Sequence, residues 1–292
     1  YGVTRDKVVS MKVLLSDGSS AEIGALHPSE VALKSKGSDL ESNIYKCVVK
    51  ELSDNKIKDS IRKHFPRQEI HRRNTGYAVD ALLESNAFTP GGKPFNLAQL
   101  LCGSEGTLAL TTEITLQLDP LPPEEAAMIV PHYHTLEESL SDVVPVMEHP
   151  LYMCEMMDRV ILDCTKNNLE HLENRFFVEG DPAALLMLEI REETEEALDA
   201  AVNKLLETLN KSGKSYAAPV LRGKEISRAI QLRKAGLGLL GNMVGDRKAV
   251  ACIEDTAVAL PDLRDFIGEF TSIMKGYGQE AVYYAHAGAG EL

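Results

Sequence analysis

Apolar and polar residues alternate over residues 8–15, near the start of the chain. This alternation predicts a strand, which the turn signal Asp17-Gly18 would end. In the first part of the chain the pattern further predicts strands over 21–23 and 109–118, one long helix over 40–61 and a short helical turn over 97–101.

Leu121-Pro122-Pro123 interrupts this pattern, and paired prolines end secondary-structure elements and stiffen a chain. We therefore place a boundary here, with one domain over residues 1–121 and a second over 122–292. Strands alternate with helices in the second domain, which predicts an α+β fold with helices on one face of a sheet. Thr135 and Glu138 form the signature of a capping box at one helix start. The strands are expected over 126–132, 151–156, 183–190, 216–220, 250–258 and 281–285, and the helices over 136–147, 158–168, 192–212, 224–240 and 263–277.

The composition is ordinary for a globular protein. With 292 residues the chain is long enough for two domains, and 44% of its residues are hydrophobic and 26% charged. The net charge of −13 argues against nucleic acid as a partner, and no apolar run approaches the ~18 residues of a transmembrane segment. The five cysteines are scattered without a CxxC motif, so we expect a reducing, cytoplasmic location and no iron–sulfur or zinc-thiolate site within this chain.

The clearest candidate for chemistry is a glycine-rich loop, Gly103–Thr107, between a helical turn and a strand. Its two glycines would let the backbone approach a flat ligand or a phosphate, and its N–H groups could donate hydrogen bonds to it. A tight turn that needs a positive φ is the alternative, and spacing alone leaves both open. His132 and His134 would project to the same side of a strand, but a metal site there lacks a third ligand nearby.

The segment Gly103–Glu113, followed by Ile114-Thr115-Leu116, closely resembles the flavin-binding signature of the FAD-linked oxidases with a vanillyl-alcohol-oxidase-type flavin domain. Within that family the chain resembles the D-2-hydroxy-acid dehydrogenases, which include D-lactate dehydrogenases, D-2-hydroxyglutarate dehydrogenases and one component of glycolate oxidase. Its later part is similar to the cap domain of the long bacterial members, which carry an iron–sulfur region downstream. Further segments that resemble the family, in the same order, are Tyr1–Val8, Leu15–Gly18, Arg72–Tyr77, Arg233–Leu240, Gly245–Lys248, Ile253–Val258 and His286–Leu292.

The resemblance implies an enzyme that oxidises a small D-2-hydroxy acid, of the D-lactate or D-2-hydroxyglutarate type, to the 2-oxo acid by hydride transfer to flavin N5. It implies FAD and, as in several members, a divalent metal such as zinc that polarises the substrate hydroxyl. Iron–sulfur clusters would belong only to a region downstream. A quinone or another carrier would accept the electrons, which is compatible with a cytoplasmic protein peripheral to the inner membrane. A homodimer is left open.

The resemblance assigns flavin binding to Gly103, Ser104, Glu105, Gly106 and Leu110. It assigns the substrate carboxylate to Arg233, whose guanidinium could grip it with parallel hydrogen bonds, and a metal to His286. A solvated or salt-bridged arginine and a structural histidine are the alternatives. The chain departs from the family pattern where threonine, glycine and proline are usual, at Leu237, Ala109 and Ala259.

We expect the sequence to be the middle of a longer protein, because it begins without an initiator Met and ends inside the His286–Leu292 motif. Residues 1–121 would be the second half of a flavin domain without its pyrophosphate loop, and 122–292 a ferredoxin-like cap truncated at its C-terminus. The chain by itself is expected to be inactive. Two alternatives are a family member that acts on a different substrate and a non-catalytic docking or assembly module of an electron-transfer complex.

Overall fold

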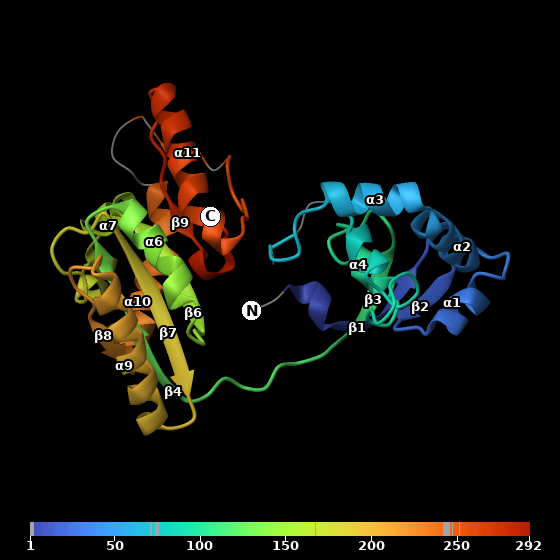
Figure 1. The fold of residues 1–292 in the computed structure, drawn as a ribbon, viewed down its shortest axis with the longest axis horizontal. Helices are drawn as coiled ribbons and strands as arrows, with labels where there is room; N and C mark the ends of the chain where they lie inside the picture. The colour runs from blue at the N-terminus through green and yellow to red at the C-terminus, as the bar shows by residue number, and fades with distance from the viewer. Residues whose placement is uncertain are drawn as a thin grey trace. The chain divides into compact units, whose positions relative to one another are not determined.

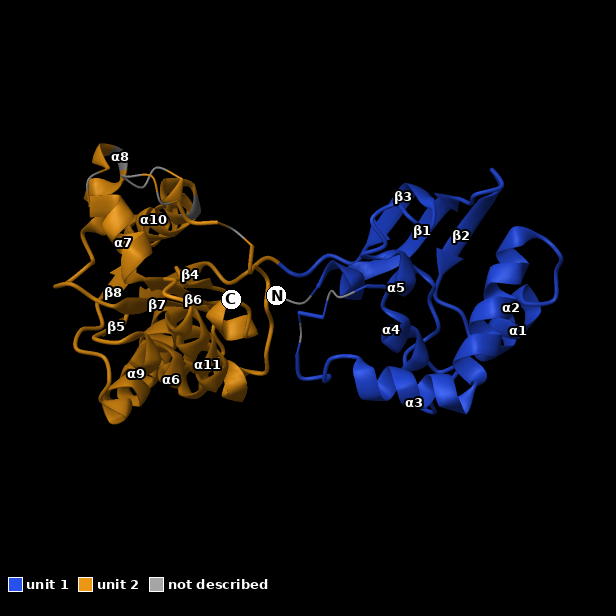
Figure 2. Ribbon diagram, turned by 90° about the horizontal axis from the view of Figure 1, so that it is seen from above, with its two compact units in different colours: residues 1–120 blue, residues 121–292 orange. Residues whose placement is uncertain are grey.

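The structure is a computed structural model that describes residues 3–70, 72–73, 76–166, 168–241, 246, 248–250 and 252–292. The chain divides into two compact units, residues 1–120 and 121–292, which Figure 2 colours separately. The division falls beside the paired prolines. None of the described helices is both long enough and apolar enough to cross a bilayer.

A three-stranded antiparallel sheet organises the first unit, in the order β2-β1-β3. Its strands β1 (Val8–Leu14), β2 (Ser20–Gly24) and β3 (Leu110–Leu116) correspond to the three that the alternation predicts. Met11 and Val13 of β1 share a core with Tyr45 and Phe95. The helices are α1 (Pro28–Lys34), α2 (Leu40–Ser53), α3 (Asn55–His64), α4 (Val79–Leu83) and α5 (Ala98–Leu101). Figure 1 labels α1 to α4, and Figure 2 labels α5.

The prediction of a single helix over 40–61 is wrong, because one helix ends before Asp54 and another begins after it. The backbone of Asp54 is extended, and its carboxylate accepts hydrogen bonds from the N–H groups of Lys56 and Ile57. Asp favours such a capping position over a helix interior, since its short side chain competes for backbone N–H groups. Leu52 and Ile61, on either side of the break, enter the same core. The apolar periodicity therefore continues across the break and conceals it.

The second unit is built on a larger antiparallel sheet in the order β8-β4-β7-β6-β9, with β5 paired to β7. Its strands are β4 (Glu125–Ile129), β5 (His132–Tyr133), β6 (Met153–Asp158), β7 (Ala184–Glu192), β8 (Val220–Arg222) and β9 (Tyr284–Ala285). Its helices are α6 (Leu136–Val146), α7 (Arg159–Lys166), α8 (Leu169–Leu172), α9 (Glu195–Ser212), α10 (Lys224–Leu240) and α11 (Leu263–Gly276). This mixture of helices and antiparallel strands confirms the predicted α+β class.

Helices cover both faces of this sheet, so the prediction of helices on one face is wrong. Helices α6, α9 and α11 pack on one face, and α7 and α10 pack on the other (Figure 2). The central strand β7 is buried at every position from Ala184 to Ile190. A strand that is covered on both faces needs apolar side chains in both directions, which explains its nearly continuous apolar run.

Several predicted strands are shorter or interrupted. The strand expected over 126–132 splits into β4 and β5 around Pro131, which has no N–H for the ladder. Of the strand expected over 250–258, the described residues show an isolated bridge between Ala257 and Glu291. Asp255 has a φ of 55°, which is incompatible with a strand, and Ala251 lies outside the described residues. The strand expected over 281–285 is reduced to β9. The strand expected over 216–220 is displaced, because β8 shares only Val220 with it and Ala217 forms an isolated bridge with His132.

Candidate functional site

The glycine-rich loop of the first unit has backbone in the left-handed region at three positions. The φ angle is 84° at Gly103, 51° at Glu105 and 74° at Gly106. This region is strained for a residue with a side chain, so Glu105 holds a conformation that occurs often at functional sites. A Cβ on Gly106 would meet no described atom within 4 Å. The positive φ angle, and not a lack of space, therefore explains why a glycine occurs at position 106. The open space beside it would admit a ligand close to the backbone.

The other predicted flavin residues differ in exposure. Ser104 is buried, and its carbonyl accepts hydrogen bonds from the N–H and the hydroxyl of Thr107 at 3.0 and 2.6 Å. Leu110 begins β3 with 64% of its surface exposed. Ser104 therefore supports the loop from inside, while Leu110 offers an apolar surface next to it.

Two more segments that carry the family resemblance meet at this loop. Arg5 donates hydrogen bonds to the carbonyls of Gln99 and Cys102, at 3.1 and 3.4 Å. The hydroxyl of Tyr77 lies 2.8 Å from that of Thr107. Segments from three parts of the sequence thus support one loop. Outside the described residues lie parts of the resembling segments, namely residues 1–2, 74–75, 245 and 247.

In the second unit, the structure brings together Arg233 and His286, which are predicted site residues from distant parts of the sequence. Arg233 lies on α10, and His286 directly follows β9. Glu155 of β6 joins them, because its Oε1 lies 2.9 Å from Nδ1 of His286 and its Oε2 accepts a hydrogen bond from Nη2 of Arg233. The reasoning from sequence missed Glu155.

The guanidinium of Arg233 is nearly buried, with 8% of the residue exposed. Its Nη1 donates to the hydroxyl of Tyr284 at 2.5 Å, and its Nη2 also donates to the carbonyl of Ala285 at 3.2 Å. The guanidinium carbon lies 4.0 Å from the centroid of the Tyr284 ring, in a cation–π contact. Burial raises the pKa of Tyr284, so its hydroxyl keeps its proton and donates to the carbonyl of Arg233 at 2.8 Å. Among the described residues, the buried Nε of Arg233 has no hydrogen-bond partner.

The glycines that follow His286 hold its turn against β6. A Cβ on Gly288 would lie 2.9 Å from the Cβ of Cys154, which is closer than two carbons pack. Gly290 has a φ of 67°, and a Cβ there would lie 2.1 Å from the carbonyl oxygen of Val258. Packing therefore requires both glycines of this motif, and the tight turn fixes where His286 can be.

The described residues do not supply a complete set of ligands for the metal predicted at His286. No group of three or more His, Cys, Asp or Glu side chains that could hold a metal ion occurs among the described residues. His132, the weaker metal candidate, is buried, and both its ring nitrogens bond the backbone. Nδ1 donates to the carbonyl of Val130 at 2.7 Å, and Nε2 accepts from the N–H of Glu179 at 3.2 Å. His134 stacks on Tyr216 at 4.4 Å, so neither histidine faces a cluster of metal ligands within the described part of the chain.

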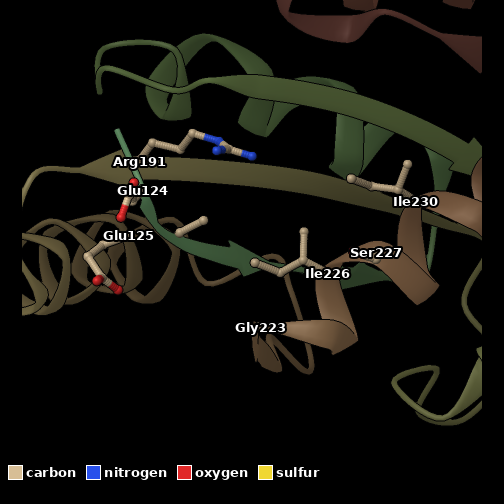
Figure 3. Close-up of a pocket in the computed structure, with 8 residues that line it drawn as sticks. Glu124, Glu125, Arg191, Gly223, Ile226, Ser227 and Ile230 are labelled. Carbon is tan, nitrogen blue, oxygen red and sulfur yellow. The ribbon is translucent and has the colours of Figure 1, made fainter. Parts of the chain in front are cut away.

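A cavity of about 270 Å³ in the second unit is lined by residues 124–126, by Arg191 and by residues at and after the start of α10 (Figure 3). Its polar lining combines the carboxylates of Glu124 and Glu125 with the guanidinium of Arg191. Arg191 already has a partner, because its Nε donates to Glu189 at 2.7 Å. The cavity contains none of the predicted site residues.

The sequence profile described as "FAD linked oxidases, C-terminal domain" matches residues 122–292. The chain belongs to this family. The match covers the unit that holds Arg233, Glu155 and His286. It confirms the family that the resemblance indicates.

The curated relatives of this FAD-linked oxidase chain include two that are similar over its whole length. The D-2-hydroxyglutarate dehydrogenase of Pantoea ananatis is 25% identical over 302 residues, which cover 100% of this chain and 29% of that protein. The enzyme of the same name from Escherichia coli is 26% identical over 302 residues, with the same coverage. The D-lactate dehydrogenase of Archaeoglobus fulgidus is 28% identical over 229 residues, or 75% of this chain and 48% of that protein. The chain thus spans less than a third of the length of these hydroxyglutarate dehydrogenases.

Among solved structures, the 4-ethylphenol oxidase of Gulosibacter chungangensis is similar with a TM-score of 0.51 at 10% identity. The likeness covers 96% of this FAD-linked oxidase chain and 49% of that protein. At this identity it shows the fold alone, and it agrees with the α+β architecture.

Proposed function

We propose that the protein containing this chain is an FAD-dependent dehydrogenase that oxidises a small D-2-hydroxy acid to the 2-oxo acid. The observation that carries the proposal is the meeting of Arg233 and His286 at Glu155. The guanidinium of Arg233 is suited to bind a carboxylate, and the imidazole of His286 is suited to bind a hydroxyl. A 2-hydroxy acid carries a carboxylate and a hydroxyl on adjacent carbons. The names of the relatives, D-2-hydroxyglutarate dehydrogenase and D-lactate dehydrogenase, support the same substrate class.

Arg233 is the proposed anchor for the substrate carboxylate. Beyond its bonds to Tyr284, Glu155 and Ala285, the guanidinium retains its Nε–H and one hydrogen on Nη1. These two donors lie on different edges of the planar guanidinium, so either of them could give a carboxylate oxygen one charge-assisted hydrogen bond. A purely structural ion pair would leave the buried Nε without a partner among the described residues, and buried donors without partners are uncommon. The orphaned Nε therefore favours a ligand over the structural alternative.

His286 is the proposed contact to the substrate hydroxyl. Its Nδ1 is engaged by Glu155, so Nε2 remains for a ligand, on a side chain that is 48% exposed. Zinc takes at least three protein ligands, of which His286 would be one, so the metal at His286 stays a prediction. The proposed role of His286 therefore uses only its ring nitrogen.

The loop Gly103–Gly106 is the proposed flavin contact in the first unit. Its left-handed backbone, and the open space beside Gly106, fit a flat group that approaches the main chain. FAD, when bound, supplies the hydride acceptor for the oxidation. A quinone or another carrier is the proposed acceptor of the electrons.

The proposal is tested by reduction of a redox dye by the full-length protein with D-lactate, D-2-hydroxyglutarate or glycolate as substrate. Arg233→Lys is expected to raise KM by about tenfold or more, because it removes a charge-assisted hydrogen bond. Arg191→Lys is the matched control. Like Arg233, Arg191 pairs with a glutamate, Glu189, and covers a tyrosine ring, since its guanidinium carbon lies 4.6 Å from the centroid of the Tyr152 ring.

The control should leave KM unchanged, since Arg191 lies outside the cluster. A wild-type protein that reduces the dye with none of the acids would overturn the proposed function. Equal changes of KM in the two variants would remove Arg233 from the role of anchor and leave the activity itself intact.

A further inference from the structure

Glu155 is placed by the pairing of β6 with β9. Met156 lies opposite Ala285, and Met157 lies opposite Tyr284. One step further along this antiparallel register, Glu155 comes opposite His286, where cross-strand side chains are neighbours. Its side chain is 13% exposed, so this carboxylate is largely shielded from water. A shielded carboxylate needs partners, and both of its oxygens have one.

The bond to Glu155 fixes which nitrogen of His286 carries hydrogen. An ionised carboxylate only accepts hydrogen bonds, so Nδ1 must be the donor in this pair. In the neutral ring, Nε2 then has a free lone pair and can accept a hydrogen bond or a proton. A carboxylate behind a histidine commonly sets its tautomer and ring orientation in this way.

The same carboxylate fixes the rotation of the Arg233 guanidinium. Nη2 donates to Glu155 on one side and to the carbonyl of Ala285 on the other. Nη1 is held by the hydroxyl of Tyr284. The plane of the guanidinium is therefore set by groups on β6 and β9, and each of its remaining donors has a fixed direction.

We propose that Glu155 is a positioning residue that orients Arg233 and His286 as one unit for a 2-hydroxy acid. The proposal rests on the proposed function. Glu155 itself touches no substrate in this arrangement. It sets the donors of Arg233 for the carboxylate and the acceptor nitrogen of His286 for the neighbouring hydroxyl.

The second buried glutamate–arginine pair of this unit is a natural comparison. Glu189 has a side chain that is 3% exposed and binds Nε of Arg191 at 2.7 Å. No hydrogen bond or ion pair between Glu189 and a histidine occurs among the described residues, whereas Glu155 binds His286. Loss of either carboxylate leaves a shielded guanidinium with fewer partners and lowers stability. The loss of Glu155 alone should alter the two proposed substrate contacts.

Glu155→Gln separates these roles, because an amide oxygen accepts hydrogen bonds and an amide nitrogen donates them. With its oxygen toward Arg233, the new side chain would turn its NH₂ to Nδ1 of His286 and move the ring hydrogen to Nε2. With its oxygen toward His286, the amide would face Arg233 with a second donor. The first arrangement disturbs the proposed contact of His286 with the substrate, and the second disturbs that of Arg233, while the size of the side chain is unchanged.

The test uses the full-length holoenzyme with Glu155→Gln and, as the matched control, Glu189→Gln. KM and kcat are measured with the 2-hydroxy acid that the wild type uses best. Glu155→Gln should lower kcat/KM by about tenfold or more, since a small misplacement of reacting groups has effects of this size. In the Arg233→Lys, Glu155→Gln double variant, the loss should be smaller than the product of the two single losses, because Glu155 acts through Arg233.

A second measurement does not depend on turnover. The rate of acylation of His286 by diethyl pyrocarbonate, followed by peptide mass spectrometry, reports the free lone pair on the exposed nitrogen. It should fall by about tenfold in Glu155→Gln with the amide oxygen toward Arg233, the arrangement in which each donor meets an acceptor, because loss of a hydrogen bond to a charged group shifts the tautomer ratio by this factor. The rate at the exposed His134 serves as an internal reference.

Unchanged kcat/KM and an unchanged rate at His286 would overturn the role of Glu155, and equal effects of Glu155→Gln and Glu189→Gln would also overturn it. Failure of the proposed function would give a different result, namely a wild-type protein without activity toward any 2-hydroxy acid. The acylation rates still decide in that case whether Glu155 sets the tautomer of His286.

Discussion

Two glycines on α10 offer a matched test of how tightly the helix that carries Arg233 is packed. Gly236 is buried, and a Cβ there would lie 2.7 Å from Cγ2 of Ile161 on α7. Gly238 is exposed, and a Cβ there would meet no described atom within 4 Å. Alanine at either position gains the same helix propensity, about 1 kcal/mol relative to glycine. The difference between Gly236→Ala and Gly238→Ala therefore isolates the contact with α7.

The size of this difference follows from the distance. Carbon atoms pack at about 3.5–4.0 Å, so the new methyl group would overlap Ile161 by about 1 Å. The side chain of Ile161 is fully buried, and Cγ2 sits on the branch next to the backbone, so it has little room to move. Overpacking of this kind typically costs about 1–3 kcal/mol. Gly236→Ala should be less stable than Gly238→Ala by this amount, and Gly238→Ala should be slightly more stable than the wild type.

Hydrogen exchange of peptides from α10, measured by mass spectrometry, reports the opening free energy of this helix in the full-length protein. Protection should decrease in Gly236→Ala and increase in Gly238→Ala. Arg233 lies one turn before Gly236, so a shift of α10 by about 1 Å should also lower kcat/KM, by up to about 100-fold. Equal protection in the two variants would show that α10 and α7 are packed more loosely than the structure indicates, and would refute this reasoning.

Two further predictions concern stability. Burial lowers the pKa of His132 below its usual value of 6.5, so the unfolded chain takes up a proton more readily and stability is lost as the pH falls below about 6.5. In thermal melts, the decrease in melting temperature on acidification should be smaller in His132→Gln than in wild type. The control His134→Gln, at an exposed position, should show the same decrease as wild type. Gly290→Ala should lower the unfolding free energy by more than about 2 kcal/mol, because it combines a strained φ of 67° with a contact to Val258 at 2.1 Å. Gly278→Ala, which has a φ of 63° and no described atom within 4 Å of the new Cβ, isolates the backbone strain, so equal melting temperatures for these two variants would contradict the clash.

The helices of the second unit were predictable wherever a local signal marks their ends. Thr135 accepts a hydrogen bond from the N–H of Glu138, whose carboxylate accepts one from the N–H of Thr135, so α6 begins where the capping box places it. Helix α10 likewise spans the predicted residues, 224–240. Such signals act within a few residues, and a single sequence contains all of them.

The short strands were predictable only in part, because their extent depends on partners elsewhere in the chain. β9 covers only Tyr284–Ala285, since its register with β6 ends where the tight turn after His286 begins. Helices on both faces of the sheet were missed for a related reason. The buried run of β7 reads as a strand in either case, and only tertiary packing decides how many layers cover it.

The candidate site divides in the same way. Arg233 and His286 were found because their segments resemble a family in the right order, and no periodicity or spacing would have selected them. Glu155 has a different signal, a carboxylate flanked by the apolar Cys154 and Met156 of β6, where an acid is rarely buried unless it is paired. Glu189 in β7 shows the same signal and pairs with Arg191 alone among its described neighbours. The sequence can therefore point to both acids as paired, but only the register of β6 with β9 brings a histidine to one of them, and that third partner turns a stabilising ion pair into a candidate for the chemistry of the site.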